Sequence, residues 1–514
     1  MTLILCLLAF GNTSALEEQY KAHVRFLADD LLEGRETTYR GQKLAARYLA
    51  AQLAAQGVVP AFPDQTDPFF QEFKVVISSP DPDSLRLRVS GSGQTEELVY
   101  GSDYSYMSRG SGELDLEAPI VFVGYGIKRN DYNDYEGVDV KGKWVMILPG
   151  QPVVKEKISP FSTQVPESSP FAKMRAARTQ GAAGIFYTMN QDKVNGRGLQ
   201  RNMSLPDLPS ERDHGVFPAI QLTEKAWRLL MGKKMASRCK KAMERINKSG
   251  KPRSFQLKKR SATFSLKVHS EMASSENVVG ILPGTDPVLK DEFVVISAHY
   301  DHEGIKGGVV YNGADDNASG SATLLLAAQY MRPEVRRRSL IILLVSGEEK
   351  GLLGSRYFVH NPIVPLEKIV ANINIDMIGR SDDGSVGMIP ALINGVTSLN
   401  EMAGNVNEMG SHNLTLRTDM DRYHTRSDHY NFSKKNVPAI FFFTGTHEDY
   451  HQPGDDWEKL HYDEMAHFFT FFKDFTLKAA LKHESNQPLE RAVKRVKVST
   501  FFEILIESRP IPAK

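Results

Sequence analysis

Potential metal ligands follow four strongly apolar segments in the second half of this chain. The segments are Phe293 to Ala298, Leu340 to Val345, Ile369 to Ile375 and Val437 to Phe443. The residues that follow them are His299, the pair Glu348 and Glu349, Asp376, and a loop that holds His447 and His451. Continuous apolar segments of this length are typical of strands covered on both faces in an α/β sheet. Because such sheets bind ligands beyond the carboxyl ends of their strands, we expect these side chains to converge in one crevice.

The first ligand candidate, His299, is followed two residues later by Asp301. A carboxylate in this position can accept the second ring N–H of a metal-binding histidine and fix its orientation. A single histidine at the end of a strand is more often structural, and His302 keeps that simpler interpretation. The case for His299 therefore depends on its neighbours.

A turn of small residues from Gly313 to Gly320 carries Asp315, Asp316 and Asn317 into a predicted helix. Acidic turns usually cap helices, and Asp315 or Asn317 would suit that role. An aspartate here could also lie between two cations, because a bridging carboxylate holds metals ~3.5–4 Å apart. The turn alone leaves these alternatives open.

Two further acidic positions follow buried strands. Glu348 and Glu349 come soon after a segment without polar residues, whereas adjacent glutamates on a surface are normally just solvated. Adjacent side chains point in different directions, so one glutamate can bind metal while the other stays free as a base. Asp376 ends another apolar strand, where a buried carboxylate needs a metal or a hydrogen-bonding partner.

The elements around these residues predict an α/β protein with a large insertion. Apolar residues recur at helical spacing from Glu17 to Gln56. Between about Leu87 and Ala262, short β-rich segments alternate with Gly, Pro, Asn and Asp. Within that region Phe171 to Arg178 is predicted to be a helix and Gly184 to Tyr187 a buried strand. A compact α+β insert fits this pattern.

Length, charge and cysteine content narrow the function classes. A chain of 514 residues exceeds the ~250–300 residues of one ordinary core, so more than one module is expected. Its 63 Lys and Arg against 62 Asp and Glu give no reason to propose a nucleic acid or an anionic membrane as partner. The two cysteines, Cys6 and Cys239, provide neither a disulfide framework nor a cysteine-based zinc site. Any metal must be held by histidines and carboxylates.

The first residues indicate export. Leu3 to Phe10 is apolar, and the small residues that follow predict a signal peptide, residues 1–15, cleaved near Ala15. The apolar stretch is too short to span a bilayer, and no later segment reaches the ~18 apolar residues of a span. We therefore expect a secreted or periplasmic protein without stable membrane insertion. The sequence does not indicate an oligomeric state.

The order of the motifs between about Asn277 and Leu460 is more specific than any one of them. His-x-Asp, Asp-Asp-Asn, Glu-Glu, Asp-Met, Ser-Asp-His and Tyr-His follow one another along the chain. As a set they resemble the co-catalytic zinc aminopeptidases of peptidase family twenty-eight, to which the glutamate carboxypeptidases also belong. The resemblance implies the zinc exopeptidase fold, a mixed, mostly parallel sheet flanked by helices, and two Zn²⁺ per chain.

The resemblance also implies roles for individual residues. The implied metal ligands are His299 and Glu349 for one ion, Asp376 and His451 for the other, and Asp316 as the bridge. Asp316 is the aspartate that matches, because it lies four residues before Gly320. Glu348 matches the general base and Asp301 the orienting carboxylate. Tyr423 and His424 lie near the position where some family members carry a tyrosine that stabilises the oxyanion.

The inserted region resembles a protease-associated domain, as found in many secreted members of this family. The segments that carry this resemblance are Gly124 to Gly126, Val140 to Lys143, Lys173 to Gly184 and Pro218 to Ile220. The expected organisation is a signal peptide (1–15), an N-terminal helical part of the peptidase domain (16–113), the insert (114–262), the catalytic domain (263–484) and a C-terminal tail (485–514).

The implied function is a zinc exopeptidase, most simply an aminopeptidase that releases N-terminal residues from peptides. A hydroxide between the two ions would attack the peptide carbonyl, with Glu348 as the base. A carboxypeptidase or dipeptidase is the nearest alternative and needs a cation for the terminal carboxylate, such as Arg380, Arg422 or Arg426. A receptor-like protein without metals is the alternative from another class, and the complete ligand set argues against it.

Overall fold

The computed structural model describes residues 2–91, 94–106, 113–153, 161, 165–188, 201–208, 217–331, 336–381, 383–390 and 398–481. The chain divides into two compact units. Unit 1 comprises residues 1–73 and 274–514, and unit 2 comprises residues 74–273. The expected tail, 485–514, lies outside the described residues.

Unit 1 is built on a mixed sheet in which the four central strands run parallel. From β14 (Val268–Leu282) onward the strand order is β18 (Ser339–Val345), β15 (Phe293–His299), β19 (Ile369–Ile375), β22 (Ala439–Phe443), β20 (Ser385–Pro390) and β21 (Thr415–Arg417). β14 pairs antiparallel with β18, and β20 pairs antiparallel with β22. The expected α/β fold, a mixed sheet flanked by helices, is confirmed.

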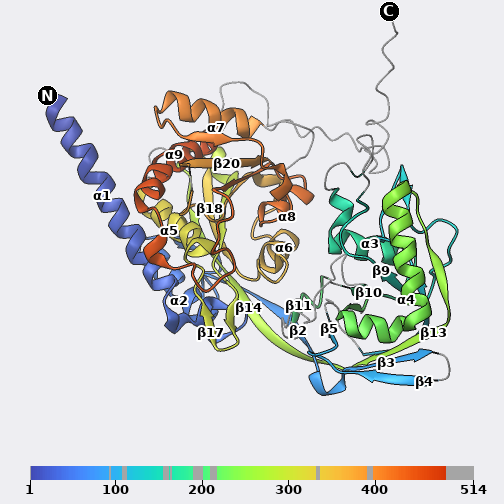
Figure 1. The fold of residues 1–514 in the computed structure, drawn as a ribbon. Helices are drawn as coiled ribbons and strands as arrows, with labels where there is room; N and C mark the ends of the chain where they lie inside the picture. Colours follow the sequence, from blue (N-terminus) through green and yellow to red (C-terminus); the bar gives the residue numbers. More distant parts are fainter. Residues whose placement is uncertain are drawn as a thin grey trace, which may run out of the picture. The chain divides into compact units, whose positions relative to one another are not determined.

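Helices cover both faces of this sheet (Figure 1). One face carries α1 (Thr2–Leu27), α2 (Arg40–Ala55), α5 (Gly320–Tyr330), α7 (Ser398–Met409) and α9 (Tyr462–Ala480). The other carries α6 (Leu353–His360) and α8 (His429–Lys434). Successive residues of β15 alternate between the two cores, with Val294 and Ile296 in one and Val295 in the other. This alternation explains why the ligand-bearing strands are continuously apolar in sequence.

Unit 2 is a second sheet that carries helices on both faces. Its strand order is β4 (Gln94–Leu98), β3 (Arg86–Gly91), β13 (Phe255–Leu266), β6 (Leu114–Phe122), β9 (Trp144–Ile147), β10 (Gly184–Thr188), β12 (Ala219–Leu222) and β5 (Tyr104–Tyr106). α4 (Glu224–Ser249) packs on one face, and α3 (Pro170–Thr179) packs on the other. The expected helix within 171–178 and the strand within 184–187 are both present.

The boundaries of the insert differ from the expected 114–262. Unit 2 begins at residue 74 because β3 pairs with β13 along six residues and β5 pairs with β12. These early strands therefore belong to the sheet of the insert rather than to the N-terminal part, 16–113. Unit 2 ends at residue 273, so the catalytic part resumes later than the expected residue 263.

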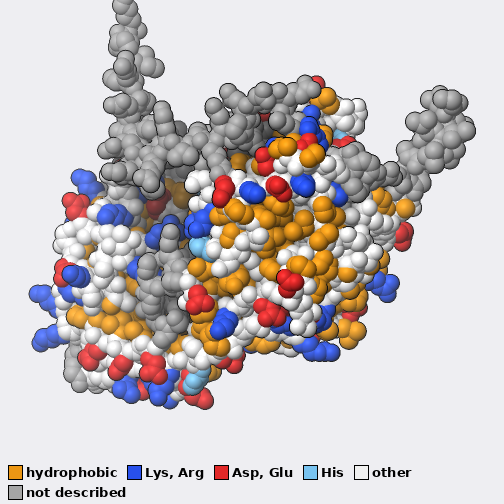
Figure 2. Space-filling model, turned by 180° about the vertical axis from the view of Figure 1, so that it is seen from behind, with side chains coloured by type: hydrophobic (Ala, Val, Ile, Leu, Met, Phe, Trp, Pro, Cys, Tyr) orange, Lys and Arg blue, Asp and Glu red, His pale blue; other side chains and the backbone are white. Residues whose placement is uncertain are grey.

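The N-terminal segment is helical, as the spacing predicts. Leu16, Tyr20 and Val24 of α1 lie in the main core of unit 1. The predicted signal peptide, 1–15, falls mostly within the first half of α1 and stays a prediction. In the described part of the chain, no helix has the length and apolar character needed to cross a membrane. On the face drawn in Figure 2, basic and acidic side chains are interspersed with apolar ones.

Candidate metal centre

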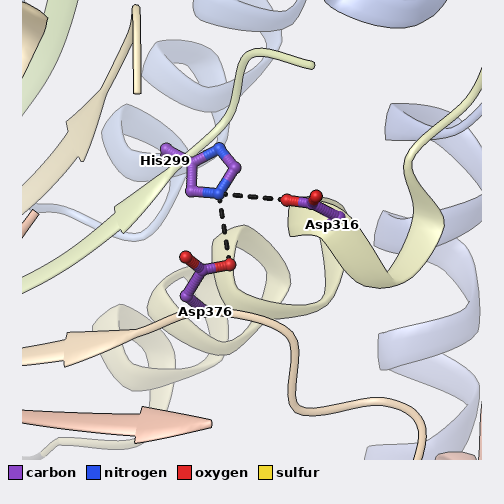
Figure 3. Close-up of side chains that lie close together, drawn as sticks. All are labelled: His299, Asp316 and Asp376. Carbon is purple, nitrogen blue, oxygen red and sulfur yellow. Dashed lines mark hydrogen bonds and ion pairs between the residues drawn. The ribbon is translucent and has the colours of Figure 1, made fainter. Parts of the chain in front are cut away.

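The first cluster of ligand candidates forms where two neighbouring strands end. His299 is the last residue of β15, and Asp376 directly follows β19, its parallel neighbour. His299 Nε2 lies 3.2 Å from an oxygen of Asp376 and 3.2 Å from an oxygen of Asp316 (Figure 3). All three residues are buried. The parallel pairing of β15 and β19 therefore brings these side chains together.

The loop that carries Asp316 is held by groups distant in sequence. Both carboxylate oxygens of Asp455 accept backbone N–H bonds, one from Asp315 and one from Asp316, each 3.0 Å long. The guanidinium of Arg35 donates to the carbonyl of Gly313 over 2.9 Å, and this side chain is fully buried. Gly313 has a φ of +61°, and a Cβ there would lie 2.2 Å from the Asp316 carbonyl oxygen. The turn therefore requires glycine at this position.

The second cluster forms around the other oxygen of Asp316. His451 Nε2 lies 3.1 Å from Asp316 Oδ2 and 3.1 Å from Glu349 Oε2. Asp316 thus directs one oxygen at His299 and the other at His451, which is the position of a carboxylate between two ions.

The ligand pairing expected from the resemblance is wrong in one respect. His299 lies with Asp376 and Asp316, whereas Glu349 lies with His451 and Asp316. The reason is that His299 and Asp376 sit at the ends of adjacent strands. Glu349 and His451 come from loops that extend beyond β18 and β22.

His302 and Glu303 belong to the second cluster, and sequence reasoning missed both. His302 is fully buried, with Nδ1 3.0 Å from Glu349 Oε1. Glu303 Oε1 lies 3.3 Å from His451 Nδ1, on the side of the ring opposite Asp316. Lys306 and Lys350 pair with the other oxygen of Glu303, at 2.5 and 3.8 Å. The sequence signal was weak, because both residues look like ordinary members of a loop.

Asp301 is close to His299, but not through the contact that was expected. His299 Nδ1 lies 3.1 Å from the backbone carbonyl oxygen of Asp301, while the nearest carboxylate oxygen is 3.8 Å away. The carboxylate instead accepts bonds from the Thr37 hydroxyl, at 2.8 Å, and the Glu348 backbone N–H, at 3.2 Å. Asp301 therefore ties together the segments that carry His299 and Glu348.

The two residues beside Asp316 have separate structural roles. Asn317 Oδ1 accepts a bond from the backbone N–H of Gly320, the first residue of α5, which agrees with the expected capping role. Asp315 instead accepts a bond from Gly379 N–H over 2.6 Å, and its other oxygen lies 3.2 Å from His447 Nε2. Burial raises the pKa of Asp315 to about 6.

Glu348 faces a pocket beside the two clusters rather than joining them. The pocket is lined by Asp316, Glu348, Asp376, Met377, Tyr423, Arg426, Phe441, Phe443, Thr446, Tyr450 and His451. Burial, together with the neighbouring Glu349 and Asp376, raises the pKa of Glu348 well above its ordinary value. A carboxyl group with a raised pKa is a better proton acceptor and donor near neutral pH than an ordinary glutamate.

Of the two transition-state candidates, Tyr423 lines this pocket and His424 does not. His424 Nδ1 lies 2.9 Å from the carbonyl oxygen of Asp421. Tyr450 is a further pocket residue that sequence reasoning did not assign, and its ring stacks on His451 at a centroid distance of 4.0 Å. The Tyr450-His451 pair in the sequence was the available signal.

The three candidate cations for a substrate carboxylate differ in position. Arg380 pairs with Asp449 at 2.5 Å. Arg422 lies over the ring of Tyr423. Of the three, Arg426 is the one that lines the pocket containing Glu348.

The electrostatics of the two clusters indicate a cation site. Burial lowers the pKa of His451, but Glu349 and Asp316 outweigh this effect and raise it to about 11. Burial raises the pKa of Asp316, but its contacts with His299 and His451 lower it to about 2. These buried carboxylates repel one another unless the imidazoles take up protons or a cation binds between them.

The donor set fits zinc. Each cluster offers imidazole nitrogen and carboxylate oxygen, which are common zinc ligands. Three sets of ligand atoms each lie within 4.8 Å of one another: His299, Asp316 and Asp376; His302, Asp316 and Glu349; and Glu303, Glu349 and His451. Their closest separations of 3.1–3.2 Å approach the roughly 3.3 Å expected for two atoms each about 2 Å from one tetrahedral ion.

Comparisons with known proteins find similar peptidases. Residues 277–476 match the model of peptidase family M28. The chain is 24% identical over 252 residues to "Aminopeptidase YwaD" of Bacillus subtilis (strain 168), which covers 47% of this chain and 52% of the relative. It is 27% identical over 203 residues to "Probable leucine aminopeptidase" of Arthroderma benhamiae, which covers 37% of this chain and 54% of the relative. The chain thus spans about half the length of these relatives.

Solved structures share the fold over nearly the whole chain. An aminopeptidase from Aneurinibacillus sp. strain AM-1 superposes with a TM-score of 0.57 at 18% identity and covers 90% of this chain and 93% of its own. A zinc aminopeptidase from Bacillus subtilis superposes with a TM-score of 0.52 at 17% identity, with 92% and 97% covered. At 17–18% sequence identity, these superpositions show that the folds are similar.

Proposed function

Residues 277–476 match the model of peptidase family M28, and on this basis we propose that the protein is a zinc-dependent aminopeptidase. The observation that carries the proposal is Asp316, whose two oxygens face two separate clusters of histidine and carboxylate. A carboxylate with a purely structural role needs only one such cluster beside it. A carboxylate shared by two metal ions explains why Asp316 faces two clusters.

The chain would hold two zinc ions through five side chains. His299 and Asp376 would bind one ion, Glu349 and His451 the other, and Asp316 both. His302 and Glu303 would hold Glu349 and His451 in place. Bound zinc lowers the pKa of water towards ~7 and polarises a substrate carbonyl.

Glu348 is the proposed general base. Its carboxylate lines the pocket next to the clusters without belonging to either. It would take a proton from the attacking water and return it to the amine that leaves. Tyr423 and Tyr450, whose side chains line the same pocket, would hold the substrate carbonyl during attack.

The composition of the pocket supports the preference for a free N-terminus. Glu348 lies in the pocket outside the proposed ligand set, and its carboxylate would attract the cationic α-amino group of a peptide. Met377, Phe441 and Phe443 form an apolar wall suited to an apolar first side chain. We therefore propose peptides with apolar N-terminal residues as substrates. The predicted signal peptide supports secreted or periplasmic action.

The test compares two substrates and measures metal. Purified protein should contain two zinc ions per chain by elemental analysis. It should hydrolyse leucine p-nitroanilide at least 100-fold faster than the N-acetylated compound. Faster cleavage of an N-blocked dipeptide with a free carboxylate would instead support a carboxypeptidase, which the position of Arg426 in the pocket allows. Protein without bound zinc would support the receptor-like alternative.

A further inference from the structure

The charge of this chain is divided unequally between its two units. Unit 2, residues 74–273, contains 32 Lys and Arg against 21 Asp and Glu, a net charge of +11. The remaining residues contain 31 Lys and Arg against 41 Asp and Glu, a net charge of −10. The formal net charge of +1 therefore hides two opposite contributions.

Most of the excess positive charge lies on α4 and the segment after it. Residues 224–260 contain 14 Lys and Arg but only two acidic residues, Glu224 and Glu244. The nine basic residues of α4 are all exposed; they are Lys225, Arg228, Lys233, Lys234, Arg238, Lys240, Lys241, Arg245 and Lys248. We call these nine side chains the basic face of α4. The helix is labelled in Figure 1.

The spacing of these residues turns the basic face into a row. Residues 234, 238, 241, 245 and 248 recur at intervals of four and three, so they lie on one side of the helix. At 1.5 Å per residue the row is about 21 Å long. The helix is interrupted at Gly232, where φ is 65° and ψ is 159°, and after this break Cys239, Ala242 and Ile246 are buried in the core of unit 2 on the opposite side. Packing of the helix therefore forces the basic row outward.

Most of these cations have no acidic partner. Arg228 pairs with Glu224, and Lys225 lies 3.8 Å from Asp103. Arg238 stacks on the ring of Phe255 at 3.8 Å. The other six residues form no salt bridge within the described part of the chain; they are Lys233, Lys234, Lys240, Lys241, Arg245 and Lys248. Concentrated like charge without partners is unfavourable for the folded protein, so it favours an external anion.

We propose that the basic face of α4 is a docking surface for an anionic phospholipid bilayer. Five of the six unpaired cations are lysines, which act as hydrated point charges on flexible stems rather than as bidentate forks. Such residues suit diffuse attraction to many headgroups, and each Lys or Arg near an anionic leaflet contributes to it. Recognition of single-stranded nucleic acid would instead call for aromatic side chains interleaved with the cations. None of the residues of α4 that are exposed is aromatic. Docking of this kind is peripheral and needs no membrane-spanning helix.

The test uses the full-length protein and vesicles of two compositions. Co-sedimentation with phosphatidylcholine vesicles containing about 30% phosphatidylglycerol should be strong in dilute buffer and at least tenfold weaker in 0.5 M NaCl, because salt screens exposed charges. Vesicles of phosphatidylcholine alone should bind at least tenfold less. Equal binding to both vesicles would overturn the proposal.

A matched pair of variants locates the surface. The triple variant Lys234→Glu/Lys241→Glu/Lys248→Glu should bind anionic vesicles at least tenfold more weakly. The control Lys128→Glu/Lys141→Glu/Lys267→Glu changes the charge of unit 2 equally at exposed positions away from α4 and should keep most of the binding. Both should keep the peptidase activity of the unaltered protein. Equal losses in the two variants would show that only net charge matters and would refute the assignment to α4.

Two further outcomes are decisive. If the triple glutamate variant fails to fold, a triple glutamine variant at the same positions removes the positive charges without adding negative ones. It should show the same loss of binding to anionic vesicles. If the protein binds DNA oligonucleotides through α4 but neither kind of vesicle, the partner is a nucleic acid and the membrane proposal is wrong.

Discussion

Both units of this protein bury charged side chains, but they do so in different ways. In unit 2, Asp134 is fully buried and accepts bonds from Tyr125 N–H, Ile127 N–H and the Tyr132 hydroxyl at 2.8–3.1 Å. Lys173, which is 2% exposed, donates to two backbone carbonyls, those of Leu148 and Gly150. These charges are satisfied by the surrounding protein. Their role is structural.

In unit 1 the buried charges instead gather with others of the same sign. Asp316 has carboxylate oxygens within 4.8 Å of those of both Asp376 and Glu349, and histidines contact all three residues. Like charges in a buried site require a cation or bound protons. A buried charge is therefore not by itself evidence of a functional site. The informative feature is a cluster whose own surroundings do not neutralise it.

The largest expected effect concerns the carboxylate shared by the two clusters. Asp316→Asn should abolish hydrolysis and remove at least one zinc, because an amide is neutral and a poor bridge between cations. Zinc content and turnover of leucine p-nitroanilide measure both effects. The matched control is Asp315→Asn, which should keep two zinc ions because Asp315 faces Gly379 and His447. The opposite result would show that the other aspartate is the bridge.

Substitution of the base should separate activity from metal binding. Glu348→Gln should lower kcat about 10²–10⁴-fold, the usual contribution of a general base, while zinc stays near two per chain. Glu349→Gln should lose zinc as well, since Glu349 belongs to a ligand cluster. Loss of zinc in the Glu348 variant, or retained turnover, would contradict the division of roles between these neighbours.

A substitution in unit 2 tests the other side of the comparison. Lys173→Met should lower the free energy of unfolding by about 1–3 kcal/mol, because it leaves the carbonyls of Leu148 and Gly150 without their buried donor. Urea unfolding measures this change. Zinc content of the folded protein should not change. Lys141→Met, at an exposed position of the same unit, is the control and should have little effect.

A smaller effect is expected from the carboxylate behind His451. Glu303→Gln should weaken zinc binding at one of the two positions about 10–100-fold, the usual effect of losing a carboxylate that orients a ligand histidine. Competition with a chelator measures this affinity. Glu36→Gln is the matched control, because Glu36 pairs with the same Lys350 at 3.4 Å. Equal weakening in both variants would indicate a general loss of the charge network.

The smallest effect concerns a buried histidine of unit 1 outside both clusters. His429 stacks on Phe441 at 4.8 Å, and burial lowers its pKa to about 3. The unfolded chain binds this proton near pH 6.5, so the neutral ring contributes stability above that pH, and the contribution is lost as pH falls towards 3. Between pH 7 and pH 5 the protein should lose about 2 kcal/mol more stability than His429→Phe. Urea unfolding at both pH values tests this, and equal losses would contradict it.

The sequence by itself determined the kind of site and the strands that carry it. The apolar segments ending in His299 and Asp376 predicted parallel strands, and the order of motifs predicted which side chains would meet. These features follow from local chemistry, because continuous apolar strands must be covered on both faces and acids at their ends need partners.

Only the tertiary structure decided the details that depend on distant segments. The pairing of His299 with Asp376 follows from adjacent strands, and the start of unit 2 follows from β3 pairing with β13. Glu303 contacts the candidate ligand His451 because a loop distant in sequence brings the two side chains to 3.3 Å. The net charge of the whole chain did not indicate the basic face of α4, because the excess acidic residues of unit 1 offset the excess basic residues of unit 2. Contacts between residues far apart in sequence have no local signal, so folding alone fixes them.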